Sequence, residues 1–100
     1  MNLNQIYISH GSLYDYQLMP FFNIASKCGF NGVEIIVGRN KELSDTSYIK
    51  KLSADFQIPV RVLHCPFNSW QNEFWPKKPE QKLMRTVEMA RRLGAGVVVA

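Results

Sequence analysis

The sequence has few cysteines and no long apolar stretch, and each of these absences excludes a class of protein. Only Cys28 and Cys65 occur among 100 residues, too few for the disulfide framework of a small secreted domain. No apolar run approaches the roughly 18 residues of a membrane-spanning helix, which excludes a helical membrane protein. The first residues lack the basic start and apolar core of a signal peptide. We therefore expect a cytoplasmic protein with reduced thiols and a single domain over residues 1–100.

The short motifs of nucleotide and structural zinc sites are also missing. No Gly-x-Gly-x-x-Gly turn, Walker loop, Cys-x-x-Cys pair or His-x-x-x-His pair occurs. Twelve basic residues against eight acidic ones give a formal charge of +4 and a pI of about 9.3. The basic residues between Lys77 and Arg92, Lys82 among them, are interleaved with glutamates, which is typical of a solvated helix face. The charge pattern therefore gives little support to a nucleic-acid partner.

What the chain does contain is a regular alternation of strand-like and helix-like segments. Apolar residues make up 46% of the sequence and charged residues 20%, as in soluble globular domains. Short β-branched runs predict strands at residues 6–9, 32–37, 60–64 and 96–100. Because helical segments separate these runs, the strands must be parallel, which makes this an α/β protein.

Capping residues predict where the three intervening helices begin and end. Pro20 fits the first turn of the first helix and Gly29 its end; Ser44 or Asp45 begins the second; Pro79 opens the third and Gly94 ends it. Helical spacing then predicts the side chains that face the core. They are Phe21, Ile24, Ala25 and Cys28 in the first helix, Tyr48, Ile49, Leu52 and Phe56 in the second, and Leu83, Val87 and Ala90 in the third.

Strand alternation predicts one sheet face that is aliphatic but carries polar residues at its end. Its members are Ile6, Ile8, His10, Glu34, Ile36, Val60, Val62, His64, Val97 and Val99. This mixture suits the lumen of a barrel, although a doubly wound open sheet stays an alternative. An isolated half-barrel would leave seven of these aliphatic side chains exposed to water. The burial free energy lost would be about 10–20 kcal/mol. Whole domains are stable by only about 5–15 kcal/mol. We therefore expect one of three arrangements: a longer chain, two copies that close a barrel together, or helices on both sheet faces. The end at Ala100, within an apolar strand, favours a longer chain.

Three segments carry a resemblance to a known superfamily. They are Cys-Gly-Phe-Asn-Gly-Val-Glu-Ile (28–35), Leu-His-Cys-Pro-Phe (63–67) and Met-Ala-Arg-Arg-Leu-Gly-Ala-Gly-Val-Val-Val (89–99). In this order and spacing, the chain resembles the xylose-isomerase-like barrels, which include sugar isomerases, sugar epimerases and apurinic-site endonucleases. The resemblance implies a (β/α)₈ TIM-barrel fragment of about four parallel strands and three helices, the N-terminal half of the barrel.

The resemblance also implies an activity. It indicates a sugar or sugar phosphate isomerase or epimerase that works by metal-assisted proton transfer at the carboxyl ends of the strands. The metal would be divalent (Zn, Mn, Mg or Co), with His64 as one ligand and the others from strands beyond Ala100, so we expect the 100-residue chain alone to be inactive. Two alternatives stay open: an apurinic-site endonuclease-like metal-dependent phosphodiesterase, and a non-catalytic half-barrel that self-associates.

The candidate substrate-binding residues are His10, Glu34, His64, Phe67 and Trp70. The His64 imidazole can bind a metal or a sugar hydroxyl, or be satisfied by a backbone carbonyl. Glu34 lies in a strand buried on both sides, so it needs a cation, a backbone amide or a proton. His10 either lines the mouth of the barrel or is a solvated loop histidine. Phe67 and Trp70 belong to an aromatic loop that either stacks on a sugar or forms an apolar lid.

Overall fold

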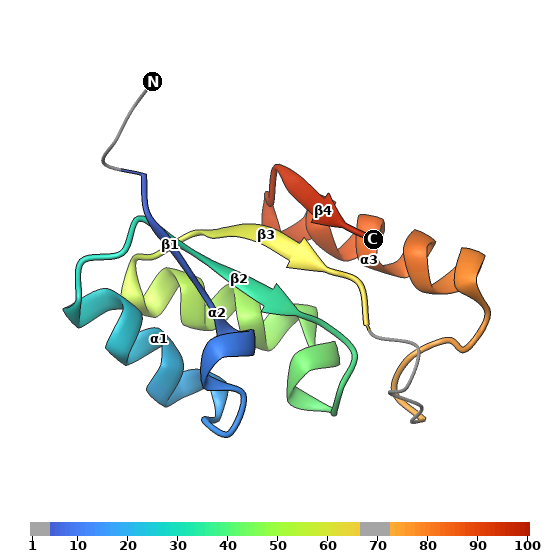
Figure 1. The fold of residues 1–100 in the computed structure, drawn as a ribbon, viewed down its shortest axis with the longest axis horizontal. Coiled ribbons are helices and arrows are strands. Elements are labelled where there is room, and N and C mark those ends of the chain that lie inside the picture. Colours follow the sequence, from blue (N-terminus) through green and yellow to red (C-terminus); the bar gives the residue numbers. More distant parts are fainter. Residues whose placement is uncertain (1–4, 67–72) are drawn as a thin grey trace.

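Strands and helices alternate along the chain in the computed structural model, which describes residues 5–66 and 73–100 (Figure 1). The strands are β1 (Tyr7–Ser9), β2 (Gly32–Ile36), β3 (Val60–His64) and β4 (Val97–Val99). The helices are α1 (Leu18–Lys27), α2 (Thr46–Phe56) and α3 (Pro79–Leu93), with short 3₁₀ helices η1 (His10–Leu13) and η2 (Glu42–Ser44). The predicted α/β class, with four parallel strands and three α-helices, is confirmed for the described residues.

The sheet has the simplest parallel topology, with spatial order β1-β2-β3-β4. Crossovers between parallel strands are almost always right-handed, so an order that runs in one direction places every crossover helix on the same face. Accordingly α1 packs beside α2 and α2 beside α3, and Figure 1 shows the three helices along one side of the sheet. A doubly wound sheet would have helices on both faces, so that alternative is wrong for the described residues.

The core lies between the helices and the sheet, and the expected capping residues position it. The Asp45 side chain begins α2 by accepting a hydrogen bond from the Tyr48 amide at 3.0 Å, Pro79 is the first residue of α3, and Gly94 ends it at a φ of 73°. The buried side chains come from all three helices and the central strands. They include Leu18, Phe21, Phe22, Ala25, Val33, Ile35, Ile49, Leu52, Leu63, Met89 and Ala90.

Two of the predicted helix stripes need correction. In α1, Cys28 is exposed because the helix ends one residue before it. In α3, Ala90 is buried as predicted, but Leu83 is 42% exposed and its place is taken by Lys82 and Thr86. Positions 82, 86 and 89 follow the spacing i, i+4, i+7, so they form one face of the helix. That face packs on the sheet. Lys82 therefore belongs to the inner face of α3, whereas its charge had predicted a position on the solvated face.

A bulge in β3 explains why the predicted strand alternation is only partly right. Val33 pairs with Val60, whereas Glu34 pairs with Val62, so Arg61 is an extra residue on β3. The bulge turns Val60 into the core instead of onto the predicted aliphatic face. Ile8 also packs against the core, because the register of β1 against β2 sends its neighbours to the opposite face.

The last strand is shorter than the predicted range of 96–100. Only Val97–Val99 form β4, and they pair with the last three residues of β3. Ala100 lies outside the strand and is exposed, because the pairing partners on β3 end at His64. The methyl side chain of Ala100 cannot ligate a metal, so it supplies no ligand at the carboxyl edge of the sheet.

We call the sheet face away from the helices the open face. Cross-strand partners share a face, and Val33 and Ile35 point into the helix layer. The open face therefore carries Tyr7, Ser9, Glu34, Ile36, Val62, His64, Val97 and Val99. The predicted grouping of Glu34 and Ile36 with Val62, His64 and the β4 valines is confirmed. No helix in the described ranges is long and apolar enough to cross a bilayer.

The turn after β2 provides a test of the packing at the carboxyl edge of the sheet. Gly38 has a φ of +83°, and a Cβ there would lie 2.7 Å from both Pro66 Cγ and Trp75 Cδ2. Gly29 has a similar φ of +77° with nothing within 4 Å, which makes it a matched control. We expect Gly29→Ala to lower the free energy of unfolding by about 1–2 kcal/mol through backbone strain alone, and Gly38→Ala to cost clearly more. Urea denaturation measures both, and equal losses would contradict the packing described.

Candidate functional site

Glu34 on the open face is held by a serine hydroxyl. Ser9 and Glu34 are direct cross-strand partners in β1 and β2, and Ser9 Oγ donates a hydrogen bond to Glu34 Oε1 at 3.0 Å. The same hydroxyl accepts a hydrogen bond from the Gly11 amide at 3.1 Å, which fixes its direction. The partly buried carboxylate thus has a neutral donor on one oxygen, in place of the cation, backbone amide or proton expected from the sequence.

His64 ends β3 on the same face, and its hydrogen bond fixes its tautomer. Its Nδ1 lies 2.7 Å from the carbonyl oxygen of Cys65. A carbonyl oxygen only accepts, so Nδ1 carries the proton and Nε2 is the acceptor nitrogen of the neutral ring. This is the backbone contact that the sequence offered as a structural role, and it fixes the orientation of the ring at the carboxyl end of β3.

His10 lies elsewhere, so the predicted grouping of His10 with Glu34 and His64 is wrong. It is 4% exposed, its ring meets Phe21 edge-on at 4.9 Å, and its Nε2 donates to the Tyr16 carbonyl at 2.7 Å. The chain enters η1 directly after β1, which ends the strand alternation and turns the imidazole toward α1. His10 is thus neither on the open face nor a solvated loop residue.

One edge of His10 lines a polar cleft of about 290 Å³ between the loops that follow β1 and β2. The cleft is lined by His10, Tyr14, Asp15, Tyr16, Gln17, Arg39, Asn40 and Glu42. The Arg39 guanidinium lies 5.0 Å from the centre of the Tyr14 ring, and Glu42 Oε2 accepts the Leu18 amide of α1 at 3.1 Å. These contacts tie the two loops together at the carboxyl ends of the strands, where α/β proteins bind ligands.

The sequence did not reveal this cleft, because its residues are far apart in the chain. The usable signal is indirect: loops that follow consecutive parallel strands meet at one edge of the sheet. Reading the polar and aromatic residues of both loops together, from Tyr14 to Gln17 and from Arg39 to Glu42, would have pointed to it.

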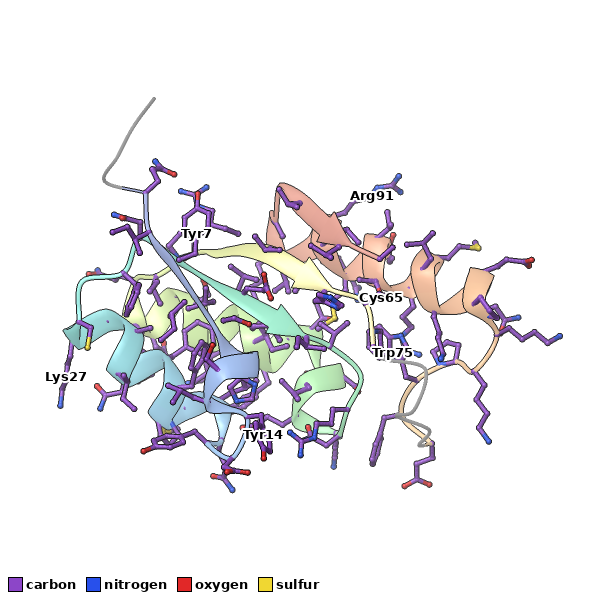
Figure 2. The ribbon with its side chains drawn as sticks, viewed as in Figure 1. Tyr7, Tyr14, Lys27, Cys65, Trp75 and Arg91 are labelled. Atoms are coloured by element: carbon purple, nitrogen blue, oxygen red, sulfur yellow. The ribbon has the colours of Figure 1, made fainter. Side chains whose placement is uncertain are left out.

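The aromatic loop after β3 is described only from residue 73 onward. Phe67 and Trp70, the two loop residues proposed to contact a sugar, lie outside the described residues. Trp75 is 6% exposed; its ring packs against Gly38, and the Arg85 guanidinium lies 5.0 Å from the ring centre. Trp75 therefore packs against the turn after β2, at the carboxyl end of that strand; Figure 2 labels its side chain and that of Cys65.

The described residues do not make a metal site by themselves. Within residues 5–66 and 73–100, no three His, Cys, Asp or Glu side chains converge to hold an ion. The Cys65 sulfur next to His64 is turned toward α3, where the Thr86 hydroxyl lies 3.5 Å away. A divalent metal at this edge would need ligands other than the described residues, and the ligands expected beyond Ala100 stay a prediction.

Comparison with known proteins gives relatives but no activity. No protein-family model matches the sequence. The chain is 34% identical over 92 residues to an uncharacterized protein of Mycobacterium leprae (strain TN). It is 33% identical over 92 residues to uncharacterized proteins of Mycobacterium tuberculosis (strain H37Rv) and Mycobacterium bovis. Each match covers 92% of this chain and 33% of the relative, so the chain spans about a third of these relatives' length.

The two histidines are expected to be opposite neutral tautomers. His64 donates from Nδ1 and His10 from Nε2, because each faces a carbonyl oxygen. Long-range ¹H–¹⁵N correlation spectra of the neutral rings should show the proton on Nδ1 for His64 and on Nε2 for His10. The same tautomer in both rings, or averaging between tautomers at His64, would contradict the hydrogen bond from His64 Nδ1 to the Cys65 carbonyl.

Proposed function

We propose that the chain forms four consecutive strands, with their three connecting helices, of a (β/α)₈ barrel. The complete barrel would isomerise or epimerise a sugar or sugar phosphate. The observation that carries the proposal is the position of Glu34 and His64 on the open face, with His64 at the carboxyl end of its strand. In a closed barrel this face becomes the lumen, and carboxyl strand ends build the active site. The one-directional strand order and the single helix layer support the barrel part of the proposal.

Uncovered apolar surface supports the same architecture. Val97 and Val99 of β4 are 52% and 37% exposed. A groove of about 540 Å³ runs along the outer side of α3, lined by Leu83, Met84, Val87, Glu88 and Arg91. In a complete barrel, further strands and helices would pack on these surfaces. The relatives fit this size, because 92 residues at 33% of their length correspond to about 280 residues, near the roughly 250 of a typical barrel.

The residues of this chain would bind and orient the sugar. The His64 imidazole would contact the sugar at the carboxyl end of β3, and Glu34, held by Ser9, would present a fixed acceptor on the same face. The resemblance implies a divalent metal, which would polarise the sugar oxygens, and carboxylates that lie outside this chain. For that reason the proposal assigns binding, and not turnover, to the 100 residues alone.

Titration of the ¹⁵N-labelled chain with aldoses and ketoses, free and phosphorylated, tests this function. We expect shifts in the amide signals of Ser9, Glu34 and His64, with three- to tenfold weaker binding in His64→Ala, about the value of one hydrogen bond. Lys51→Ala, which changes an exposed residue of α2, should bind like the wild type. No saturable shift at these three residues with any sugar would contradict the proposal.

The endonuclease alternative rests on the net charge of +4 and on the position of His64 at the end of β3. It predicts binding to a duplex with an abasic site, with an affinity that falls steeply as salt is raised. Binding of that kind without any response to sugars would replace the isomerase proposal.

A self-associating half-barrel is the third candidate, favoured by the exposed valines of β4. Sedimentation should then show a dimer that Val97→Asp dissociates, while Met84→Asp on the outer side of α3 leaves it intact. A dimer that binds no sugar would support this reading over the first.

A further inference from the structure

His10 has an open acceptor nitrogen in an otherwise buried ring. Its Nε2 donates to the Tyr16 carbonyl oxygen at 2.7 Å, so the neutral ring presents Nδ1 as an acceptor. Nδ1 has no hydrogen-bond partner in the described part of the chain. It is not among the fully buried atoms that lack a partner, so it reaches solvent although the residue is only 4% exposed. The hollow that His10 lines is the polar cleft between the loops after β1 and β2.

Glu42 brings a fixed carboxylate to the same cleft from the loop after β2. Its Oε2 accepts the Leu18 amide at the N-terminus of α1 at 3.1 Å, which orients the side chain. Its Oε1 makes no hydrogen bond or ion pair with any described residue and is not fully buried. Asp15, on the loop after β1, adds a second, exposed carboxylate to the lining. Acceptor groups from two loops therefore line one cavity of about 290 Å³.

An anion is a poor occupant for this cleft. The N-terminus of a helix is a common anion site, but at α1 the Glu42 carboxylate already occupies it. Arg39, the basic residue among the described lining residues, donates to the Tyr14 carbonyl and covers one face of the Tyr14 ring. Two carboxylates, Asp15 and Glu42, against one guanidinium give these lining residues a formal charge of −1 when His10 is neutral. A cation is therefore favoured.

The acceptors suit an ammonium group better than a metal ion. Within residues 5–66 and 73–100, no three His, Cys, Asp or Glu side chains are placed to hold a metal. An ammonium group has three N–H donors that point in different directions. Its contacts are about 2.8 Å long, against about 2.1 Å for a metal–oxygen bond, so it reaches acceptors that lie further apart. The Tyr14 and Tyr16 rings, 55% and 46% exposed, border the cleft and add faces that attract a cation.

We propose that this cleft binds the primary ammonium group of a small polar molecule, with His10 Nδ1 and Glu42 Oε1 as its acceptors. The cleft volume is close to the lower end of small-molecule sites, which span roughly 300–1,000 Å³. An amino acid or an amino sugar has a suitable size, and both carry the same ammonium group. The site is separate from the open face, because the His10 ring packs on Phe21 of α1. It therefore does not rest on the proposed function.

Titration of the ¹⁵N-labelled chain with ethanolamine and with ethylene glycol tests the ammonium group alone. Ethylene glycol has a hydroxyl in place of the ammonium group, which makes it the matched control. We expect ethanolamine to give a saturable shift of the His10 Nδ1 signal and of the Glu42 amide signal, and ethylene glycol to give none. No shift at His10 with ethanolamine, equal shifts with both compounds, or a stronger response to acetate would overturn the site.

A charge-removing substitution tests the carboxylate. Glu42→Gln keeps an oxygen that can accept the Leu18 amide, and urea denaturation checks that the variant folds. We expect it to weaken ethanolamine binding about three- to tenfold, as for a partly exposed charged hydrogen bond. Glu80→Gln, the same change at an exposed position of α3, should bind like the wild type. Equal affinity in the two variants would overturn the site. The His10 signal of the wild type decides the matter without any substitution if Glu42→Gln fails to fold.

Serine and glucosamine distinguish the two sources of the ammonium group. Serine that binds more tightly than ethanolamine supports the site with an amino acid as its occupant, because its carboxylate would lie in the same cleft as Arg39. Glucosamine that binds more tightly supports the site with an amino sugar. In both cases the shifts at His10 and Glu42 should match those with ethanolamine; shifts elsewhere only would overturn the site.

The positions of the shifts also separate this site from the proposed function. Shifts at His10 with ethanolamine, together with no response of Ser9, Glu34 and His64 to neutral sugars, support the cleft site and contradict the sugar assignment. Sugar shifts at those three residues, together with a His10 signal that ignores every amine, overturn the cleft site alone.

Discussion

The one-directional order of the four parallel strands is the constraint on which the rest of the structure depends. Right-handed crossovers place all helices on one face, so the other face is covered by none of the described elements. That face carries aliphatic side chains together with Ser9, Glu34 and His64. The polar contacts within it and the apolar surface around it follow from the same topology, since a sheet with helices on both faces would have buried these side chains in a core.

The chemistry concentrates at the carboxyl edge of this sheet. The Cys65 carbonyl holds the His64 imidazole at this edge, and the polar cleft lies between the neighbouring loops. Trp75 lies at the same edge, and its buried Nε1 has no partner among the described residues.

Much of the fold could be predicted from the sequence, because local rules decide it. Asp45, Pro79 and Gly94 mark helix ends by their own conformational preferences, and alternation correctly placed Glu34 with His64. The bulge at Arg61 could not be predicted, because it arises from pairing between strands distant in the chain. The same holds for Lys82: its charge suggested solvent, whereas its spacing from Thr86 and Met89, which the packing of α3 selects, places it inside.

The central claim is that the open face is the interior of a closed barrel. The most direct measurement is a crystal structure of one of the mycobacterial relatives, which are about three times as long as the aligned segment. The account predicts that the aligned segment forms four adjoining strands of an eight-stranded barrel, with the positions of Glu34 and His64 directed at its axis. Helices packed on both faces of an open sheet, or those two positions directed outward, would contradict it.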